Sequence, residues 1–571
     1  MSQAMMIQAP EFPRHFLAPD LDLGDWNSLE PYFRKLAESP IETREQLDAW
    51  LAELSELSAA IAQESSLRYI QMTCNTDDPE REAAYLHYVQ EISPRCEPEF
   101  FELSQKFLAS PALSELPADR YQVFIRNHRS QVELYRQENV ALQTEDETLS
   151  QQYQKASGEQ TADFDGRELT IPQIMKNLEE PDRERRHSAW KAATARLLAD
   201  REKMESIFDS MLKIRHQMAR NAGFDHFLDF QFKRLGRFDY TVQDCEAFHL
   251  GVERHIIPLR KKLLERRRQQ MGIDKLAPWD LSVDPQGRPP LRPFANSQEL
   301  TDGTNKIFSA VDSSFSDDFR VLTGRHLLDL ESRRGKAPGG YQSTLDEARL
   351  PFIFMNATGR NQDVFTLLHE GGHAFHALAY REEPIHSYRN APIEFCEVAS
   401  MGMEMMACER LTSFYSGDDA ARARESHLED IIMLLPWIMR VDGFQHWLYT
   451  NPQHTRQERA NQWRALEDRF GDELDWPELQ EWRDCSWINK LHFFCVPLYY
   501  IEYGIAQLGA LQLWVNYRKD PEGAVSAYRR ALALGNSRPL PELFAAAGLS
   551  FDFGEKMLQP LADELARELN I

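Results

Sequence analysis

The sequence lacks the signatures of several common protein classes. Its seven cysteines are scattered and never form a C-x-x-C pair, which argues against a disulfide framework and a thiolate zinc site. No apolar run approaches the roughly 20 residues of a membrane span. Charged and proline residues occupy positions 1–17, where a signal peptide needs an apolar run. No internal repeat or low-complexity segment is evident. We therefore expect a reducing, cytoplasmic setting.

Positive charge is also scarce. The 571 residues include 65 Lys and Arg against 90 Asp and Glu, which gives a formal net charge of −25. An acidic protein repels phosphate groups, so we expect neither a nucleic acid nor an anionic membrane as a partner. A chain of this length can bury a large core and form more than one lobe.

One short run carries most of the functional information. Residues 369–373 read His-Glu-Gly-Gly-His, the H-E-x-x-H pattern of zinc peptidases. Residues four apart lie on one face of an α-helix, so His369 and His373 can reach one metal ion. Glu370 points about 100° away from His369 and can face a water beside that metal. The apolar residues between Val364 and Phe375 have helical spacing, which favours a helix here.

The residues around the two histidines narrow the type of site. A glycine inside a helix costs roughly 1 kcal/mol relative to alanine. We therefore expect Gly371 and Gly372 to allow the close approach of another backbone or of a substrate. Residue 379 is Ala, so the extended pattern His-x-x-Gly-x-x-His is absent and a third ligand must come from elsewhere. His376 is expected to pack or hydrogen-bond rather than bind the metal.

Three carboxylates compete to be the third ligand. Glu394, Glu397 and Glu404 lie on a helical pattern that begins near Ile393. The first two are three residues apart and share a face, and Glu404 lies two turns further along it. One of them could bind the metal while another hydrogen-bonds a ligating histidine. An exposed acidic stripe is the alternative, and the residues alone prefer none of the three.

A second candidate for function is the aromatic segment Leu491–Tyr503. If this segment is one helix, His492, Tyr499 and Tyr503 share a face despite Pro497. A histidine and two phenols on one stripe could donate hydrogen bonds to an oxyanion. Tyrosines at this spacing are also common in ordinary cores.

Most of the remaining chain has helical periodicity. Residues 43–46 fit a capping box at the start of a long helix. The turn at Asp165–Gly166 predicts a small hairpin, and the prolines of 276–295 exclude a regular element there. The apolar run Leu350–Asn356 predicts a strand just before the motif helix. That strand could pair with an extended peptide, or it could be a buried structural strand.

Four segments together point to a known family. They are Gly335–Tyr341, Thr366–His376, Glu397–Ser400 and the aromatic residues His492–Tyr503. They resemble the zinc oligopeptidases that include thimet oligopeptidase, oligoendopeptidase F and Pz-peptidase, and most of all the bacterial oligoendopeptidase F and Pz-peptidase branch. With the turn at 164–166, the resemblance covers roughly residues 160–510.

The resemblance implies the roles of individual residues. His369, His373 and Glu397 would bind one Zn²⁺ per chain, since Glu397 stands 28 positions after His369 (397 − 369), the spacing of this branch. Glu370 would be the general base. The groups that stabilise the oxyanion would be the histidine and one or more tyrosines of the aromatic segment: His492, Tyr499, Tyr500 and Tyr503. The branch spaces its tyrosines differently from thimet oligopeptidases, which leaves the choice among them open.

The resemblance also implies a mainly α fold. Two helical lobes would enclose a deep substrate channel, with a small β element beside the zinc helix. We expect an N-terminal helical region at 1–160 and a catalytic region at 161–571, intertwined into one channelled body. The oligomeric state is not indicated.

The function implied is that of a zinc-dependent oligoendopeptidase. It would hydrolyse internal bonds of short unstructured peptides, with a metal-bound water as the attacking group and Glu370 as its base. A carboxypeptidase on the same scaffold is one rival, and its carboxylate-binding cation could be Arg333, Arg334 or Lys336. A non-catalytic peptide-binding protein with a structural zinc is another, and the intact Glu370 argues against it.

Overall fold

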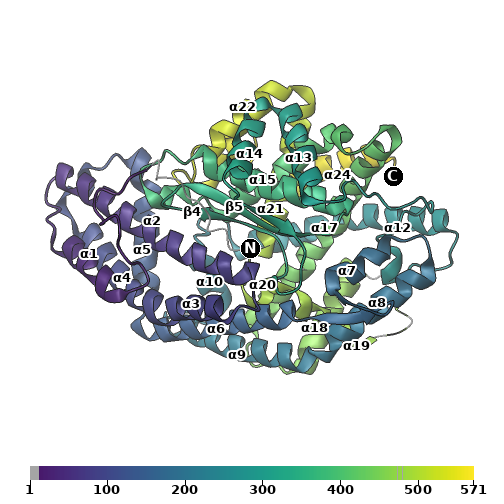
Figure 1. Ribbon diagram of the computed structural model, residues 1–571, viewed down its shortest axis with the longest axis horizontal. Coiled ribbons are helices and arrows are strands. Elements are labelled where there is room, and N and C mark those ends of the chain that lie inside the picture. The colour runs from purple at the N-terminus through teal and green to yellow at the C-terminus, as the bar shows by residue number, and fades with distance from the viewer. Residues whose placement is uncertain (1–11, 472, 477, 479) are drawn as a thin grey trace.

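Helical periodicity in the sequence becomes helix along most of the chain (Figure 1). The computed structural model describes residues 12–471, 473–476, 478 and 480–571. Within these residues the strands form only two small sheets. The predicted mainly α fold class is therefore confirmed.

The helices before residue 280 are α1 (Trp26–Glu38), α2 (Arg44–Cys74), α3 (Pro79–His87), α4 (Ser93–Ala109), α5 (Ala118–Leu134), α6 (Gln137–Gly158), α7 (Ile171–Met175), α8 (Arg183–Ala199), α9 (Arg201–Asn221), α10 (Phe227–Arg234), α11 (Val242–His255) and α12 (Ile257–Met271). The later helices are α13 (Ser297–Val311), α14 (Ser313–Gly324), α15 (Asn361–Ala379), α16 (Ile393–Ala407), α17 (Gly417–Thr450), α18 (Arg456–Phe470), α19 (Gln480–Cys485), α20 (Leu491–Phe494), α21 (Tyr500–Lys519), α22 (Pro521–Leu532), α23 (Leu540–Ala546) and α24 (Glu555–Leu569). The strands are β1 (Thr161–Phe164), β2 (Arg167–Thr170), β3 (Leu328–Glu331), β4 (Tyr341–Leu345) and β5 (Leu350–Ala357).

Several local predictions are confirmed. The capping box forms at the start of α2, where the Thr43 hydroxyl accepts from the Gln46 backbone and the Gln46 side chain accepts from the Thr43 backbone. Strands β1 and β2 pair antiparallel around Asp165 and Gly166, which both have positive φ as a tight hairpin turn requires. In the proline-rich stretch 276–295 the only helical element is one short 3₁₀ turn.

The strand before the motif helix is the centre of a three-stranded sheet. Strand β5 pairs with β3 on one edge, in parallel, and with β4 on the other, antiparallel. Residues 350–355 of β5 are all buried. A strand paired on both edges has no free backbone groups for a peptide, so the alternative of strand addition to residues 350–356 is wrong. The segment is instead a buried structural strand.

Two large hydrophobic cores hold the chain together, and Met72, Tyr85 and Val89 form a third, small cluster. The smaller core is formed by α1, α2, α4 and α5 with their connections, and Ile385 and Tyr388 join it from the second half of the chain. The larger core runs through the rest and also takes in Ile70 of α2 and Tyr153 of α6. Helix α2 thus contributes to both cores. The division of the chain at residue 160 stays a prediction.

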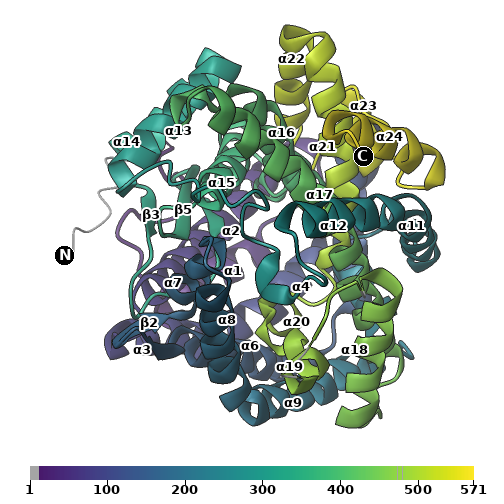
Figure 2. The same ribbon diagram turned by 90° about the vertical axis from the view of Figure 1, so that its right-hand side faces the viewer.

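The elements of the motif meet in the middle of the molecule. Helix α15 packs against β5, β4 and α16, and α16 packs against α21. Figure 2 shows α15, α16 and α21 side by side in one half of the molecule. Three segments that are far apart in the sequence are therefore brought together around one point.

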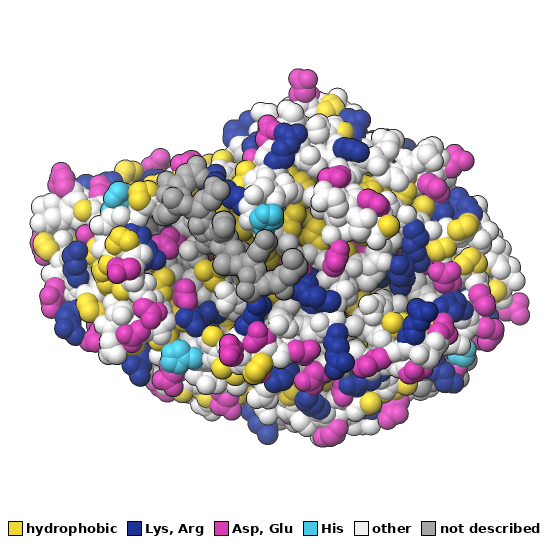
Figure 3. Space-filling model, viewed as in Figure 1, with side chains coloured by type: hydrophobic (Ala, Val, Ile, Leu, Met, Phe, Trp, Pro, Cys, Tyr) yellow, Lys and Arg dark blue, Asp and Glu magenta, His cyan; other side chains and the backbone are white. Residues whose placement is uncertain are grey.

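The net negative charge of the sequence predicts a surface without a large basic patch. On the face in Figure 3, acidic and basic side chains are interspersed, with no large basic field. None of the helices among the described residues combines the length and the apolar character needed to cross a membrane.

Candidate active site

The two glycines of the motif let α15 approach its neighbours, α16 at Gly372 and α13 at Gly371. A Cβ atom on Gly372 would lie 2.5 Å from the backbone oxygen of Ala399 and 2.6 Å from Cα of Ser400, both on α16. A Cβ on Gly371 would lie 2.5 Å from the Phe308 ring on α13. Atoms cannot approach so closely, so a side chain at 371 would displace the Phe308 ring, and one at 372 would push the backbone of α16 away. The predicted close approach of another backbone is confirmed at Gly372.

This helix contact brings the two histidines to Glu397. Nε2 of His369 lies 3.3 Å, and Nε2 of His373 lies 3.7 Å, from Oε2 of Glu397. One ligand atom from each of the three residues lies within 4.8 Å of the other two, and no other such group of His, Cys, Asp or Glu occurs among the described residues. Two imidazoles and a carboxylate at this spacing suit a zinc ion.

Neighbouring groups hold two of the three side chains, His369 and Glu397, from behind. Nδ1 of His369 is hydrogen-bonded to Oε1 of Glu404 at 2.7 Å, which turns Nε2 toward the common point. The Ser400 hydroxyl donates to Oε2 of Glu397 at 3.1 Å, and the Tyr499 hydroxyl donates to Oε1 at 2.5 Å. Such partners fix the orientation of metal ligands in proteins.

Metal binding requires a carboxylate anion and neutral imidazoles, and two of the three groups are already in these states. Burial alone would raise the pKa of Glu397, but the nearby His373 and His369 hold it at about 2. Burial lowers the pKa of His373 to about 4, so this ring is neutral at pH 7. Burial acts in the same direction on His369, but its hydrogen bonds to Glu397 and Glu404 outweigh burial and raise its pKa well above the usual value. A metal must therefore displace a proton from His369.

The other carboxylates and His376 have different surroundings. Glu394 accepts a hydrogen bond from Tyr240 at 2.6 Å and is buried away from the histidines. Of the three carboxylates left open by the sequence, the structure therefore brings Glu397 to the histidines and places Glu404 behind His369. His376 is buried and packs edge-on against Tyr380 and Phe395, as expected of a packing residue.

Glu370 lies beside the group of three on its own face of α15. Its side chain is 5% exposed, and burial raises its pKa to about 8. Strand β4 covers it, since the Gln342 backbone hydrogen-bonds it and a Cβ on Gly340 would lie 3.3 Å from Oε1. Nothing in the sequence signalled this contact with β4.

The aromatic segment is not one helix, which corrects the prediction. Helix α20 ends at Phe494 and α21 begins at Tyr500, and Leu498 between them has φ +66°. Pro497 has no N–H to continue a helix. The Leu498 N–H donates to the Gln445 side chain at 2.6 Å, and its carbonyl oxygen accepts from Arg237.

The break still brings the predicted residues together. Nε2 of His492 lies 3.2 Å from the hydroxyl of Tyr503, and the His492 ring also packs against Tyr499 and Tyr500. Burial lowers the pKa of His492 to about 3, so the ring is neutral. Because Tyr499 also donates to Glu397, this aromatic group adjoins the two-histidine group.

The fold is mainly helical, and its H-E-x-x-H helix meets a glutamate of the next helix. These features place the protein in the class of metallopeptidases. Comparison with known families gives the particular group. Peptidase family M3 matches residues 177–563, and the peptidase M3 N-terminal domain matches residues 21–135. The chain belongs to peptidase family M3, and the resemblance inferred from the sequence is confirmed. Membership implies a metal cofactor.

Individual relatives agree with this assignment. The plasmid-encoded oligoendopeptidase F of Lactococcus lactis subsp. cremoris is 22% identical over 404 residues, which cover 65% of this chain and 64% of that protein. The chromosomal oligoendopeptidase F of the same organism is 26% identical over 164 residues, 28% of this chain and 26% of that protein. The chain thus spans less than two thirds of either relative. The solved structure of Pz peptidase A with an inhibitor has a TM-score of 0.92, with 28% identity and 98% of each chain covered.

Proposed function

We propose that this protein is a zinc-dependent oligoendopeptidase that hydrolyses internal bonds of short unstructured peptides. The observation that carries the proposal is the convergence of His369, His373 and Glu397, with Glu370 at their side. A purely structural metal site needs no base beside it, so Glu370 argues against the peptide-binding rival. The names of the relatives, oligoendopeptidase F, support the substrate class.

In this proposal a zinc ion would be held by Nε2 of His369, Nε2 of His373 and a carboxylate oxygen of Glu397. When bound, zinc supplies a Lewis acid that polarises the scissile carbonyl and makes a water acidic near neutral pH. Glu404 keeps the His369 ring turned toward the ion through its hydrogen bond to Nδ1.

Glu370 moves the proton. Its carboxylate accepts a proton from the attacking water and then passes that proton to the leaving amine nitrogen as the peptide bond breaks. Both forms of the side chain must therefore be accessible near neutral pH. Burial raises the pKa of Glu370 to about 8, and a divalent cation beside it acts in the opposite direction. The balance of these two effects suits a group that first accepts and then donates.

Tyr503 is the phenol that we assign to the oxyanion. The Tyr499 hydroxyl is already used on Glu397. Tyr503 lies near the site, since burial and then the nearby carboxylates of Glu397 and Glu370 raise its pKa. If His492 donates its Nε2 hydrogen to Tyr503, the Tyr503 hydroxyl hydrogen is free for the developing negative charge on the substrate oxygen.

The carboxypeptidase rival finds little support. Such an enzyme needs a cation that is free to bind the substrate's terminal carboxylate. Lys336 is buried and donates to Asp329 at 2.9 Å and to the backbone oxygens of Glu331 and Met355. Arg333 forms two 2.6 Å hydrogen bonds with the same Asp329, and Arg334 is exposed, 3.9 Å from Glu168.

The test is the hydrolysis of an internally quenched peptide, with the products mapped by mass. We expect internal cleavage that stops with a chelator and returns with zinc. Glu370→Gln should keep stoichiometric metal and lose about 10²- to 10⁴-fold in turnover. A folded protein of ordinary size should stay intact, as the enclosed channel implied by the family requires. Removal of single C-terminal residues, or near-normal turnover in Glu370→Gln, would contradict the proposal.

A further inference from the structure

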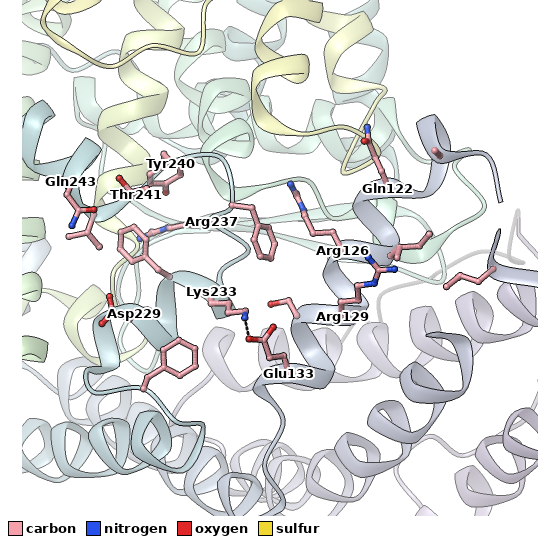
Figure 4. A pocket seen from close by; sticks show the side chains of 18 of the residues that line it. Gln122, Arg126, Arg129, Glu133, Asp229, Lys233, Arg237, Tyr240, Thr241 and Gln243 are labelled. Atoms are coloured by element: carbon pink, nitrogen blue, oxygen red, sulfur yellow. Dashed lines mark ion pairs between the residues drawn. The ribbon is translucent and has the colours of Figure 1, made fainter. Parts of the chain in front are cut away.

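A cavity lies outside the candidate active site. It has a volume of about 1030 Å³ and lies between α5 and the segment that runs from α10 into the start of α11 (Figure 4). Much of its wall is apolar, from Leu116, Ile125, Phe224, Phe232 and Phe238. Its size is that of a site for a small organic ligand. None of the residues assigned above to the metal, the proton or the oxyanion lines it.

Buried donors without partners line this cavity. Arg237 is 5% exposed; its Nη2 donates to Glu502 at 2.7 Å and to the Leu498 carbonyl, but Nε and Nη1 have no partner among the described residues. The hydroxyl of Ser130, 7% exposed, and Nε of Arg126 are likewise without a partner there. Buried polar groups are normally hydrogen-bonded, so these groups call for an acceptor.

The charges around the cavity favour an anion. Figure 4 shows Arg126 on α5 opposite the side of the cavity that carries Lys233 and Arg237, with Arg129 further along α5. Lys233 pairs with Glu133. Arg126 lies 3.5 Å from Asp239. Arg129 is exposed at the rim, and no ion pair of this side chain is found among the described residues.

The acidic groups near the cavity do not cancel this preference. Asp229 is the remaining carboxylate of the lining. Glu502 lies behind Arg237 and Glu394 behind Tyr240, so one oxygen of each is already hydrogen-bonded from the cavity wall, while Oε2 of Glu502 has no partner among the described residues. The atoms still unpaired in the buried part of the wall are therefore donors: those of Arg237, Arg126 and Ser130.

We propose that this cavity binds the terminal carboxylate of a short peptide with apolar side chains. Arg237 and Ser130 would hydrogen-bond the carboxylate, Arg129 would add charge at the rim, and the apolar wall would take the side chains. That the carboxylate belongs to a peptide rests on the proposed function, since each hydrolysis creates a new C-terminal carboxylate. The wall that binds it is also joined to the active site. Arg237 contacts the Leu498 turn before Tyr499, and Tyr240 holds Glu394 one turn before Glu397.

The experiment uses the full chain with Glu370→Gln, so that the probe is not cleaved. N-acetyl-Leu-Leu-Phe and its C-terminal amide are titrated into the protein by calorimetry, and a crystal soaked with the acid locates it. We expect density for the acid between α5 and α10, and affinity for the amide at least about tenfold lower, because a hydrogen bond to a charged group is lost.

Two further substitutions in the same background test the donors. Ser130→Ala removes a buried hydroxyl that has no partner and should not destabilise the fold, yet it should weaken binding of the acid about tenfold. Arg129→Gln should weaken it by a smaller factor, since exposed charges are screened. Arg95→Gln, an exposed arginine on α4 outside the cavity, is the matched control and should bind like the parent. Arg237 is left intact because it also holds Leu498 and Glu502.

Equal affinity for acid and amide, unchanged binding in Ser130→Ala, or density only at the active site would overturn the proposal and leave a merely hydrated cavity. The proposed function is tested apart from this, by hydrolysis of the quenched peptide with the unsubstituted enzyme. If the unsubstituted enzyme does not hydrolyse the quenched peptide but the acid still binds between α5 and α10, the proposed peptidase function would be wrong and the carboxylate site would stand.

Discussion

Two clusters in this molecule each contain two histidines and a carboxylate, but the contacts of the carboxylate differ. The active-site cluster joins two histidines to Glu397. A second cluster, between α11 and α17, joins His249 and His446 to Asp442, and Asp442 and His446 are four residues apart on one helix, as His369 and His373 are. Residue type and separation along the sequence do not by themselves distinguish the two clusters.

The difference lies in what stands behind the carboxylate. Both oxygens of Glu397 accept hydrogen bonds from outside the cluster, so the histidine nitrogens converge on a shared point. In the second cluster, Oδ2 of Asp442 lies 2.8 Å from Nε2 of His249 and 3.3 Å from Nε2 of His446, while Oδ1 has no partner among the described residues. The first arrangement leaves ligand atoms for a metal ion. In the second, the carboxylate of Asp442 joins helices α11 and α17.

The largest expected effect separates the two clusters by metal content. His373→Ala removes a proposed ligand and should abolish both stoichiometric zinc and turnover, because two remaining ligands hold zinc poorly. His446→Ala removes a histidine from the second cluster and should keep one zinc per chain. The measurement is elemental analysis of the dialysed proteins. Loss of metal in His446→Ala would show that the two clusters do not differ in their role in metal binding.

The next effect concerns the oxyanion and should leave the metal untouched. Tyr503→Phe should lower kcat about 10²-fold, because a hydrogen bond to the developing oxyanion is lost. KM should change little, since this bond strengthens only in the transition state. Tyr500→Phe, whose hydroxyl pairs with Trp437, is the control and should stay near wild type.

Tyr499→Phe completes this comparison. If Tyr499 supports Glu397, its loss should weaken metal binding more than it lowers kcat of the loaded enzyme. If all three phenylalanine variants stay within a few-fold of wild type, the tyrosines are ordinary core residues.

A smaller effect tests the support behind His369. Glu404→Gln keeps the shape of the side chain but removes the charge that accepts from Nδ1. We expect zinc affinity to fall about 10- to 100-fold, the usual cost of losing such a partner. Competition with a fluorescent chelator measures this. Unchanged affinity would mean that Glu404 does not orient the histidine.

The smallest effect is the pH dependence of stability that comes from the second cluster. Burial lowers the pKa of His446, and Asp442 is also held below its usual pKa by His446 and His249, which outweigh its burial. The unfolded chain therefore binds more protons than the folded one, and stability falls as the pH drops below about 6.5, the usual pKa of histidine.

His446→Gln should flatten this dependence. Between pH 7 and pH 5 we expect the unfolding free energy of the wild type to fall by about 1 kcal/mol more than that of the variant. Other buried histidines contribute equally in both proteins, so the difference reports His446. Parallel curves from chemical denaturation would show that this histidine does not titrate with folding.

The sequence predicts the parts of the site that depend on local geometry. The helix of the motif, the reason for its glycines and the helix that carries Glu397 all follow from spacing. The choice of Glu397 does not, because Glu394 and Glu404 sit on the same helical pattern. Their roles are set by Tyr240 and His369, which are far away in the sequence.

Two features that the sequence left open have the same cause. The break at Leu498 depends on Gln445 and Arg237, and the burial of β5 depends on partners at 328–331 and 341–345. Long-range hydrogen bonds of this kind leave no trace in local periodicity. The resemblance to a family found Glu397 only because it carries information from folded relatives.

The contact at Gly372 has a consequence for how such enzymes can diverge. Because α16 is located by its touch on α15, the position of Glu397 does not depend on the length of chain between the helices. Glu382 and Pro384 in that connection are exposed, and a longer surface loop costs little entropy. Residues inserted there would change the distance of 28 positions and leave the metal-binding geometry as it is. That distance is therefore a mark of common descent, whereas the missing side chain at 372 is the physical requirement.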